Sequence, residues 1–312
     1  MNDDSPLPPA SAPSSNATEP IETDNLGSQR VLRFTLPPIA LAGALGAFEI
    51  ARSRFQNSNM FAPSRYPAGC WDPAEEHGLR VEDIYFDSED GTRLHGWWIP
   101  HRNPRTTLVY CHGNSGSIAE RVEIFSHLQR RLRVDLFAFD YRGYGRSDGT
   151  PSEKGLFADV RAALDWVVAE RGVAMGDLLL FGHSLGGAVA IDGALHRPVA
   201  GLVVQSSFTQ VRDMARHRFP DLPVHLIARN AFRSVEKVQH LKMPKMFIHG
   251  TADSTVPFEH GRALFTTASD PKRWFEVEGA SHNDLHEHRT DRYFRRLNRF
   301  RRDCLRRRAQ QL

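Results

Sequence analysis

The sequence predicts an α/β fold in which helices cover both faces of a mostly parallel central sheet. From about residue 80 onward, segments with strand patterns alternate with segments of helical spacing. Most strand segments are continuous apolar runs, as is typical of parallel strands buried on both faces. The first two, Val81–Phe86 and Arg93–Ile99, flank a turn sequence at residues 88–91 and therefore predict an antiparallel start.

The other elements follow in alternation along the chain. Apolar runs bounded by turn residues predict the remaining strands at Thr106–Cys111, Val134–Phe139, Leu178–Gly182, Gly201–Gln205, Met246–Ile248 and Arg273–Val277. Helical spacing predicts helices at Ala119–Leu132, Ser152–Arg171 and Gly187–His196, the end of another at Arg262–Thr267, and a last one from Leu285 onward.

The composition is that of a soluble globular protein. The chain has 312 residues, of which 40% are hydrophobic and 25% charged. Its three cysteines, Cys70, Cys111 and Cys304, are too few for a disulfide framework and form no CxxC pair. His282 and His286 have the i, i+4 spacing of a metal pair, but no further ligands accompany them. We therefore expect neither a metal nor a cofactor.

The chain divides into four predicted parts. Residues 1–29 are rich in proline, serine and acidic side chains and predict a disordered polar extension. Residues 30–55 hold an apolar segment, the folded α/β domain is expected at 78–303, and 304–312 form a basic C-terminal tail. The roughly 37 residues between positions 206 and 244 are few for a large lid, so we expect a small or absent lid of one or two short helices, or an ordinary crossover helix.

The apolar segment leaves three interpretations open. Its core, Phe34–Phe48, is about 15 residues long, whereas a bilayer span needs about 20. It is consistent with a short or interfacial membrane anchor, with a helix packed on the domain, or with a cleaved signal peptide. As an anchor, its flanking arginines would favour a cytoplasmic catalytic domain. Without an anchor, the expected location is also the cytoplasm.

Ser184 is the candidate nucleophile. It lies in Gly-His-Ser-Leu-Gly at residues 182–186, between an apolar strand pattern and a helix of small residues. A serine at a sharp strand-to-helix turn is held in a strained conformation with its hydroxyl exposed at the sheet edge. The flanking glycines are required because a Cβ there would collide with the neighbouring strand and helix.

Asp253 and His282 are the candidate acid and base. Each follows the end of a predicted strand, and the carboxyl ends of parallel strands meet at one edge of a sheet. A serine hydroxyl needs a base to become nucleophilic, and the order Ser, Asp, His is the order of this arrangement. Asp253 could instead cap a turn, and His282 could begin a helix. Four other histidines compete for the role of base, namely His249, His260, His286 and His288.

The backbone N–H groups of Asn114 and Leu185 are the candidate oxyanion donors. Asn114 follows the strand that ends at Cys111, and Gly113 allows the chain to turn there so that an amide faces the serine. The loop at residues 140–147 lies at another strand end and lacks a phosphate-loop motif. We expect Asp140 and Arg142 to brace the site rather than to react.

Together these motifs resemble the α/β-hydrolase superfamily over residues 78–300. The resemblance rests on His-Gly-Asn at 112–114, Asp-Tyr-Arg-Gly-Tyr-Gly at 140–145, Gly-His-Ser-Leu-Gly at 182–186, His-Gly-Thr-Ala-Asp at 249–253 and Ser-His-Asn at 281–283. The motif sequences are most similar to those of N-terminally membrane-anchored, depalmitoylase-like hydrolases and of serine aminopeptidase-like members. It implies the α/β-hydrolase fold, Ser184 as nucleophile, Asp253 as acid, His282 as base, and Asn114 and Leu185 as oxyanion donors.

The expected activity is that of a serine hydrolase on carboxylic esters or thioesters, with a small molecule or an acylated protein as substrate. A peptidase on the same triad and a non-catalytic binding module remain alternatives. The C-terminal run from 289 to 308 holds ten arginines, which indicate either a solvated helix face or contact with an anionic membrane surface. No aromatic platform accompanies them, so no nucleic-acid partner is expected.

Overall fold

The computed structural model describes residues 60–67, 74, 77–221, 231–288 and 290–310. The predicted polar extension (1–29) and apolar segment (30–55) lie outside these ranges, as does Cys70. Among the helices that the structure describes, none is both long enough and apolar enough to cross a membrane.

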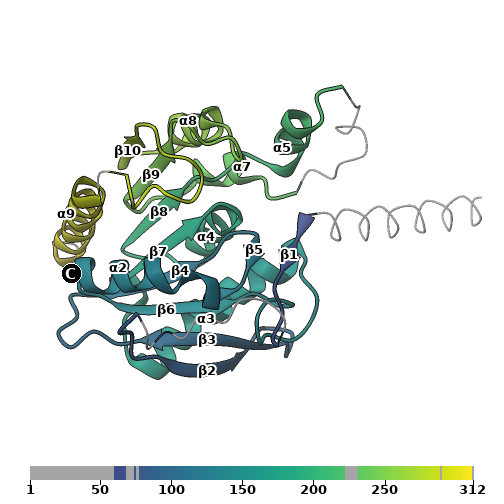
Figure 1. The fold of residues 1–312 in the computed structure, drawn as a ribbon. Coiled ribbons are helices and arrows are strands. Elements are labelled where there is room, and N and C mark those ends of the chain that lie inside the picture. Colours follow the sequence, from purple (N-terminus) through teal and green to yellow (C-terminus); the bar gives the residue numbers. More distant parts are fainter. Residues whose placement is uncertain (1–59, 68–73, 75–76, 222–230, 289, 311–312) are drawn as a thin grey trace, which may run out of the picture. The chain divides into compact units, whose positions relative to one another are not determined.

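A central sheet organises the described part of the chain (Figure 1). Its eight strands lie in the order β10-β9-β8-β7-β4-β6-β3-β2, and β3 runs in the direction opposite to the other seven. The strands are β2 (Glu82–Asp87), β3 (Arg93–Ile99), β4 (Thr107–Cys111), β6 (Asp135–Asp140), β7 (Leu178–His183), β8 (Gly201–Gln205), β9 (Lys245–Gly250) and β10 (Lys272–Val277). The sheet confirms the predicted fold class and its antiparallel start.

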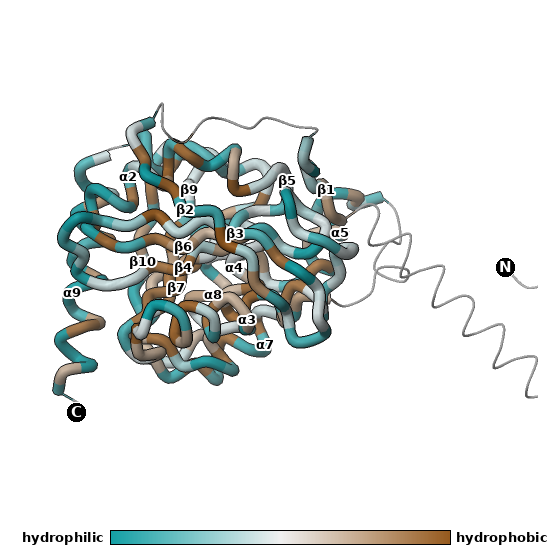
Figure 2. Tube along the Cα trace, turned by 90° about the horizontal axis from the view of Figure 1, so that it is seen from below, coloured by the Kyte–Doolittle hydropathy of each residue, from teal (hydrophilic) through white to brown (hydrophobic). Residues whose placement is uncertain are grey.

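Helices pack on both faces of the sheet and enclose two apolar cores. One core lies under α2 (Val122–Leu132) and α9 (Thr290–Ala309), and the other under α3 (Glu153–Arg171), α4 (Leu185–His196) and α8 (Phe258–Thr267). The central strands β4, β6 and β7 are fully buried or nearly so, and Figure 2 shows their hydrophobic residues between these layers. Burial on both faces explains why the strands read as continuous apolar runs.

Short elements connect these layers. They comprise η1 (Ile118–Arg121), η2 (Met175–Asp177), α5 (Val211–Arg218) and α7 (Ser234–Val238). The helices α5 and α7 both lie between β8 and β9, where the sequence predicts one or two short helices, and residues 222–230 between them are outside the described ranges.

The segment before the predicted domain boundary at 78 also packs on the domain. Strand β1 (Ala62–Pro63) pairs in parallel with β5 (Ser115–Gly116), directly after the His-Gly-Asn loop. The N–H of Tyr66 donates to Gly145 O at 3.0 Å, which links the same segment to the loop after β6. This short strand ties two loops of one sheet edge together.

Helix α9 packs through the face that its sequence predicts. Tyr293, Leu297, Phe300 and Cys304 are all buried against the sheet. The helix continues to Ala309, so most of the predicted basic tail forms its last turns.

Candidate active site

Ser184 lies at the turn between the end of β7 and the start of α4. Its backbone has φ +56° and ψ −119°. This conformation is strained for any residue that carries a side chain. The turn holds because the Ser184 N–H donates to Gln205 O at 2.9 Å. A Cβ on Gly182 would overlap the backbone of Gly186, and a Cβ on Gly186 would overlap Cys111 O. The predicted need for both glycines is thereby confirmed.

The structure brings Ser184, His282 and Asp253 into one chain of contacts. His282 Nε2 lies 2.9 Å from Ser184 Oγ, and His282 Nδ1 lies 2.8 Å from Asp253 Oδ2. The carboxylate can only accept, so the proton sits on Nδ1, and Nε2 is then free to accept the serine proton. All three side chains are buried or nearly so, which strengthens these interactions relative to water.

Three N–H donors hold the Asp253 carboxylate, and a second imidazole lies close to it. Oδ1 accepts the N–H groups of Thr255 and Val256 at 2.9 and 2.8 Å. Oδ2 accepts from His282 and lies 3.3 Å from His249 Nε2. Burial alone would raise the pKa of Asp253, but the hydrogen bonds from His249, His282 and Val256 outweigh it and keep the pKa below its usual value. The carboxylate is therefore ionised and can orient the imidazole.

His249 lies behind Asp253 rather than beside the serine. It is the fifth residue of the six-residue strand β9, is almost fully buried, and donates its Nε2–H to Val256 O at 2.9 Å. Gly261 makes room for the ring, since a Cβ there would overlap His249 Nδ1. Sequence reasoning placed His249 among the competing bases, whereas the structure gives it a supporting position on the Asp253 turn.

His183 contacts the loop that carries His282. Its Nε2 lies 3.1 Å from His282 O, and the two rings lie 5.0 Å apart between centroids. Burial lowers the pKa of His183 to about 3, so the ring is neutral and donates one hydrogen bond. This contact, which the sequence does not indicate, fixes the backbone of His282 against the nucleophile turn.

The predicted oxyanion donors lie on two chain segments that meet at Ser184. A Cβ added to Gly113 would lie 3.5 Å from Ser184 Cβ, so the loop after β4 packs directly on the serine. The Asn114 side-chain oxygen accepts from Tyr144 Oη at 3.1 Å. Leu185 is the first residue of α4, where helix N–H groups have no intrahelical partner.

A polar network braces this loop. Tyr141 Oη donates to His112 O at 2.9 Å, and Ile118 N–H donates to Asp140 Oδ1 at 2.9 Å. Arg142 forms an ion pair of 2.8 Å with the fully buried Asp159 on α3. These contacts give Asp140 and Arg142 the bracing positions that the sequence predicts.

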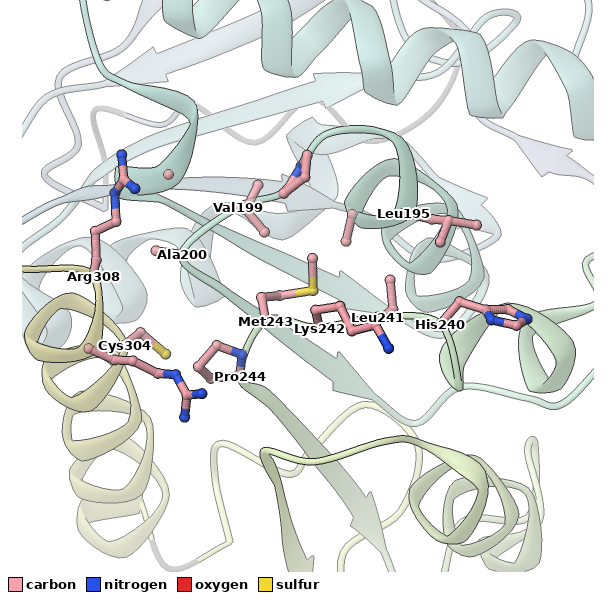
Figure 3. Close-up of a pocket in the computed structure, with 14 residues that line it drawn as sticks. Leu195, Val199, Ala200, His240, Leu241, Lys242, Met243, Pro244, Cys304 and Arg308 are labelled. Carbon is pink, nitrogen blue, oxygen red and sulfur yellow. The ribbon is translucent and has the colours of Figure 1, made fainter. Parts of the chain in front are cut away.

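A separate pocket of about 310 Å³ lies at the opposite end of the sheet (Figure 3). Its lining includes Ala200 and Pro244, which directly precede β8 and β9, together with Cys304 and Arg308 of α9. It contains none of the five predicted site residues, so we do not assign it to the reaction. Among the described residues, no group of three or more His, Cys, Asp or Glu side chains could hold a metal ion.

Comparisons with known proteins agree with the fold. A family model described as the alpha/beta hydrolase fold matches residues 106–224. The protein Rv2307c of Mycobacterium tuberculosis is 37% identical over 204 residues, which cover 65% of this chain and 72% of that protein. The protein YfhR of Escherichia coli is 33% identical over 216 residues (65% and 74%), and the alpha/beta hydrolase domain-containing protein WAV2 of Arabidopsis thaliana is 32% identical over 210 residues (61% and 68%).

Solved structures are similar in fold at low sequence identity. The esterase Pf2001 of Pyrococcus furiosus has a TM-score of 0.62 at 21% identity, covering 77% of this chain and 97% of the esterase. A puromycin-hydrolyzing peptidase of Mycobacterium tuberculosis has a TM-score of 0.61 at 17% identity, covering 73% of this chain and 40% of the peptidase. Since WAV2, an alpha/beta hydrolase domain-containing protein, matches at 32% identity over 68% of its length, this chain belongs to the α/β-hydrolase superfamily.

Proposed function

We propose that this α/β hydrolase cleaves carboxylic esters or thioesters through an acyl-enzyme intermediate on Ser184. The observation that carries the proposal is the unbroken row of contacts from Asp253 through His282 to Ser184, at 2.8 and 2.9 Å. These are the distances at which a base can take a proton from a nucleophile while a carboxylate orients the base.

In the first half of the reaction, Ser184 Oγ attacks the carbonyl carbon of the substrate while His282 Nε2 takes its proton. The N–H groups of Asn114 and Leu185 stabilise the negative charge on the carbonyl oxygen. The bond to the leaving alcohol or thiol then breaks, and His282 gives its proton to that group. Asp253 stabilises the imidazolium that exists between these two proton transfers.

In the second half, water releases the acyl group. A water molecule attacks the acyl carbon as His282 Nε2 takes one of its protons, and the bond between the carbon and Ser184 Oγ breaks. His282 returns the proton to Ser184, so that a carboxylic acid leaves and the free enzyme is restored.

The preference for ester or thioester substrates rests on two supports. The motifs in residues 112–283 resemble those of depalmitoylase-like hydrolases, which implies a small-molecule ester or an acylated protein as substrate. Two fold neighbours are esterases by name, Pf2001 of Pyrococcus furiosus and the esterase domain of a Rhodothermus marinus protein. The peptidase neighbour keeps amide cleavage as the second candidate, since the same three side chains can serve either reaction.

One experiment separates these functions. The full chain and its Ser184→Ala variant are treated with a fluorophosphonate probe and assayed on nitrophenyl esters, acyl thioesters and amino-acid nitroanilides. We expect labelling and ester or thioester turnover by the wild type only. Faster turnover of anilides would replace the proposal with a peptidase. If the folded wild type neither reacts with the probe nor turns over any of these substrates, the protein is a non-catalytic binding module instead.

A further inference from the structure

Helix α9 has an exposed arginine surface. The helix contains nine arginines and two aspartates. Seven of its arginines are exposed, namely Arg292, Arg295, Arg296, Arg299, Arg302, Arg306 and Arg307. We call these seven side chains the α9 arginine surface. It lies on the outer side of the helix, because the opposite side is buried against the sheet.

No acidic side chain in the described part of the chain neutralises this surface. The two aspartates of α9 pair with other elements, Asp291 with Arg131 and Asp303 with Arg273, each at 2.9 Å. Like charges one helical turn apart repel each other, so the arrangement works against the stability of the helix. Within the fold, Arg292 and Arg296 lie over the ring of Phe275. Among the described residues, no ion pair or ring contact accounts for the other five, and an external partner of negative charge would do so.

The arginines form a straight row rather than a cluster. Arg295, Arg299, Arg302 and Arg306 follow at i, i+4, i+7 and i+11, which is one side of a helix. From Arg295 to Arg306 the row spans about 16 Å along the helix axis, because each residue rises 1.5 Å. Guanidinium groups bind phosphate oxygens through paired N–H donors. A row of this length fits a flat array of phosphates better than a single small anion.

Positive charge continues beyond the end of the row. Arg307 and Arg308 line the pocket at the C-terminal end of α9, and Lys242, from the loop before β9, lines it as well (Figure 3). Of these, Arg308 lies 3.6 Å from Asp177. The cationic side chains of α9 and of this loop thus border one continuous region.

Two observations favour a lipid surface over a nucleic acid. The aromatic side chains of α9, Tyr293, Phe294 and Phe300, are all buried, so none can stack on bases. The sequence also holds the apolar stretch Phe34–Phe48, and stable membrane association takes a hydrophobic and a polybasic signal together. We propose that the α9 arginine surface docks the protein on an anionic lipid bilayer.

Vesicle co-sedimentation of the full chain tests the proposal. The variant combines Arg295→Gln, Arg299→Gln, Arg302→Gln and Arg306→Gln. The control removes the same charge from exposed positions outside α9, with Arg93→Gln, Arg216→Gln, Arg218→Gln and Arg233→Gln. Vesicles contain phosphatidylcholine alone or with about 30% phosphatidylglycerol, the anionic component that attracts basic surfaces.

We expect the α9 variant to bind the anionic vesicles at least about 50-fold more weakly than the wild type, and the control to change by less than about threefold. Wild-type binding falls as salt rises. The corresponding arginine-to-lysine variant keeps most of the binding. Glutamine has nearly the helix propensity of arginine, so the melting temperature of the α9 variant stays equal or rises.

Three results would overturn the proposal. These are unchanged binding of the α9 variant, an equal loss in the control, or equal wild-type binding to both kinds of vesicle. Tighter, α9-dependent binding to duplex DNA than to the vesicles would assign the surface to a nucleic acid instead. Because sedimentation needs no turnover, the result is independent of whether the protein hydrolyses esters.

Discussion

At the scale of single residues, Asp253 combines two roles that the sequence presents as alternatives. A turn-capping aspartate and a triad carboxylate both fit a position before Val256-Pro257. In the structure, Oδ1 caps the turn through Thr255 and Val256, while Oδ2 contacts His282. The turn therefore holds the carboxylate in the orientation that the imidazole requires.

The Asp253→Asn variant separates the two roles. Its side-chain oxygen can still cap the turn, but its amide cannot accept the His282 Nδ1–H, so the imidazole adopts the wrong tautomer. We expect kcat on a nitrophenyl ester to fall by about 10⁴-fold, with little change in melting temperature. Asp253→Ala should lower both. An Asn variant that keeps a tenth of the wild-type kcat would contradict the role of Asp253.

His249 is expected to act on the reaction through Asp253. Its hydrogen bond is one of the interactions that lower the pKa of Asp253, so its removal raises that pKa. In His249→Leu the carboxylate then takes up a proton at a higher pH than in the wild type. We expect the activity of this variant, relative to the wild type, to decline as pH falls toward the usual pKa of an aspartate, near 4.

The control for this prediction is His249→Gln, whose amide can donate to Val256 O in place of the ring. It should recover part of the activity lost in His249→Leu. If the activity of His249→Leu is lower than that of the wild type by the same factor at every pH, His249 has a purely structural role.

The contacts of His249 and His183 show which part of the site a sequence cannot predict. Ser184, Asp253 and His282 follow strand ends, and parallel strands place such ends at one edge, so their convergence could be predicted. His183 meets the carbonyl of His282, 99 positions away, through a contact that depends on how two loops pack. No spacing or periodicity along the chain encodes such a contact.

At the scale of elements, strands were predicted more closely than helix starts. The bounds of β3 and β8 match the predicted Arg93–Ile99 and Gly201–Gln205, because apolar runs bounded by turn residues define them. Helix α4 begins at Leu185 rather than Gly187, since its glycine-rich first turn has no apolar periodicity. The two-residue strand β1 was missed because it is too short to show any period.

Close packing between β4 and α4 gives a prediction at this scale. A Cβ on Gly186 would overlap the carbonyl of Cys111, and both are backbone groups that cannot rotate away. We expect Gly186→Ala to lower the free energy of unfolding by about 3 kcal/mol or more and to remove activity, because the helix must shift from Ser184. Denaturant unfolding and ester turnover measure the two effects.

Gly91→Ala is the matched control. Gly91 has a positive φ of +78° but no neighbour within 4 Å, so an alanine there meets strain without a clash. Its cost should be about 1 kcal/mol, with activity retained. Equal destabilisation by the two substitutions would show that the overlap with the carbonyl of Cys111 is not the cause of the loss of stability in Gly186→Ala.

At the scale of the whole molecule, the fold buries histidines in their neutral form near the edge of the sheet that holds Ser184. Burial lowers the pKa of His112 to about 4 and that of His183 to about 3. In the unfolded chain both histidines titrate near 6.5. Between about pH 6.5 and pH 4 the unfolded state therefore binds more protons than the folded state, and stability must fall as the pH falls through this window.

The His183→Gln variant isolates one of these contributions, since glutamine does not titrate. His183 has a pKa near 6.5 in the unfolded chain and about 3 in the folded protein. This difference lowers the free energy of unfolding by about 2 kcal/mol when the pH falls from 6.5 to 4.5. Urea unfolding at both pH values should show a loss of stability in the wild type that exceeds the loss in the variant by about that amount. The variant is less stable at pH 6.5, because a flexible amide replaces the buried ring that contacts the carbonyl of His282, yet it is less sensitive to acid. Parallel pH dependence in the two proteins would mean that His183 becomes protonated in the folded state, and that its contact with the His282 loop opens in mild acid.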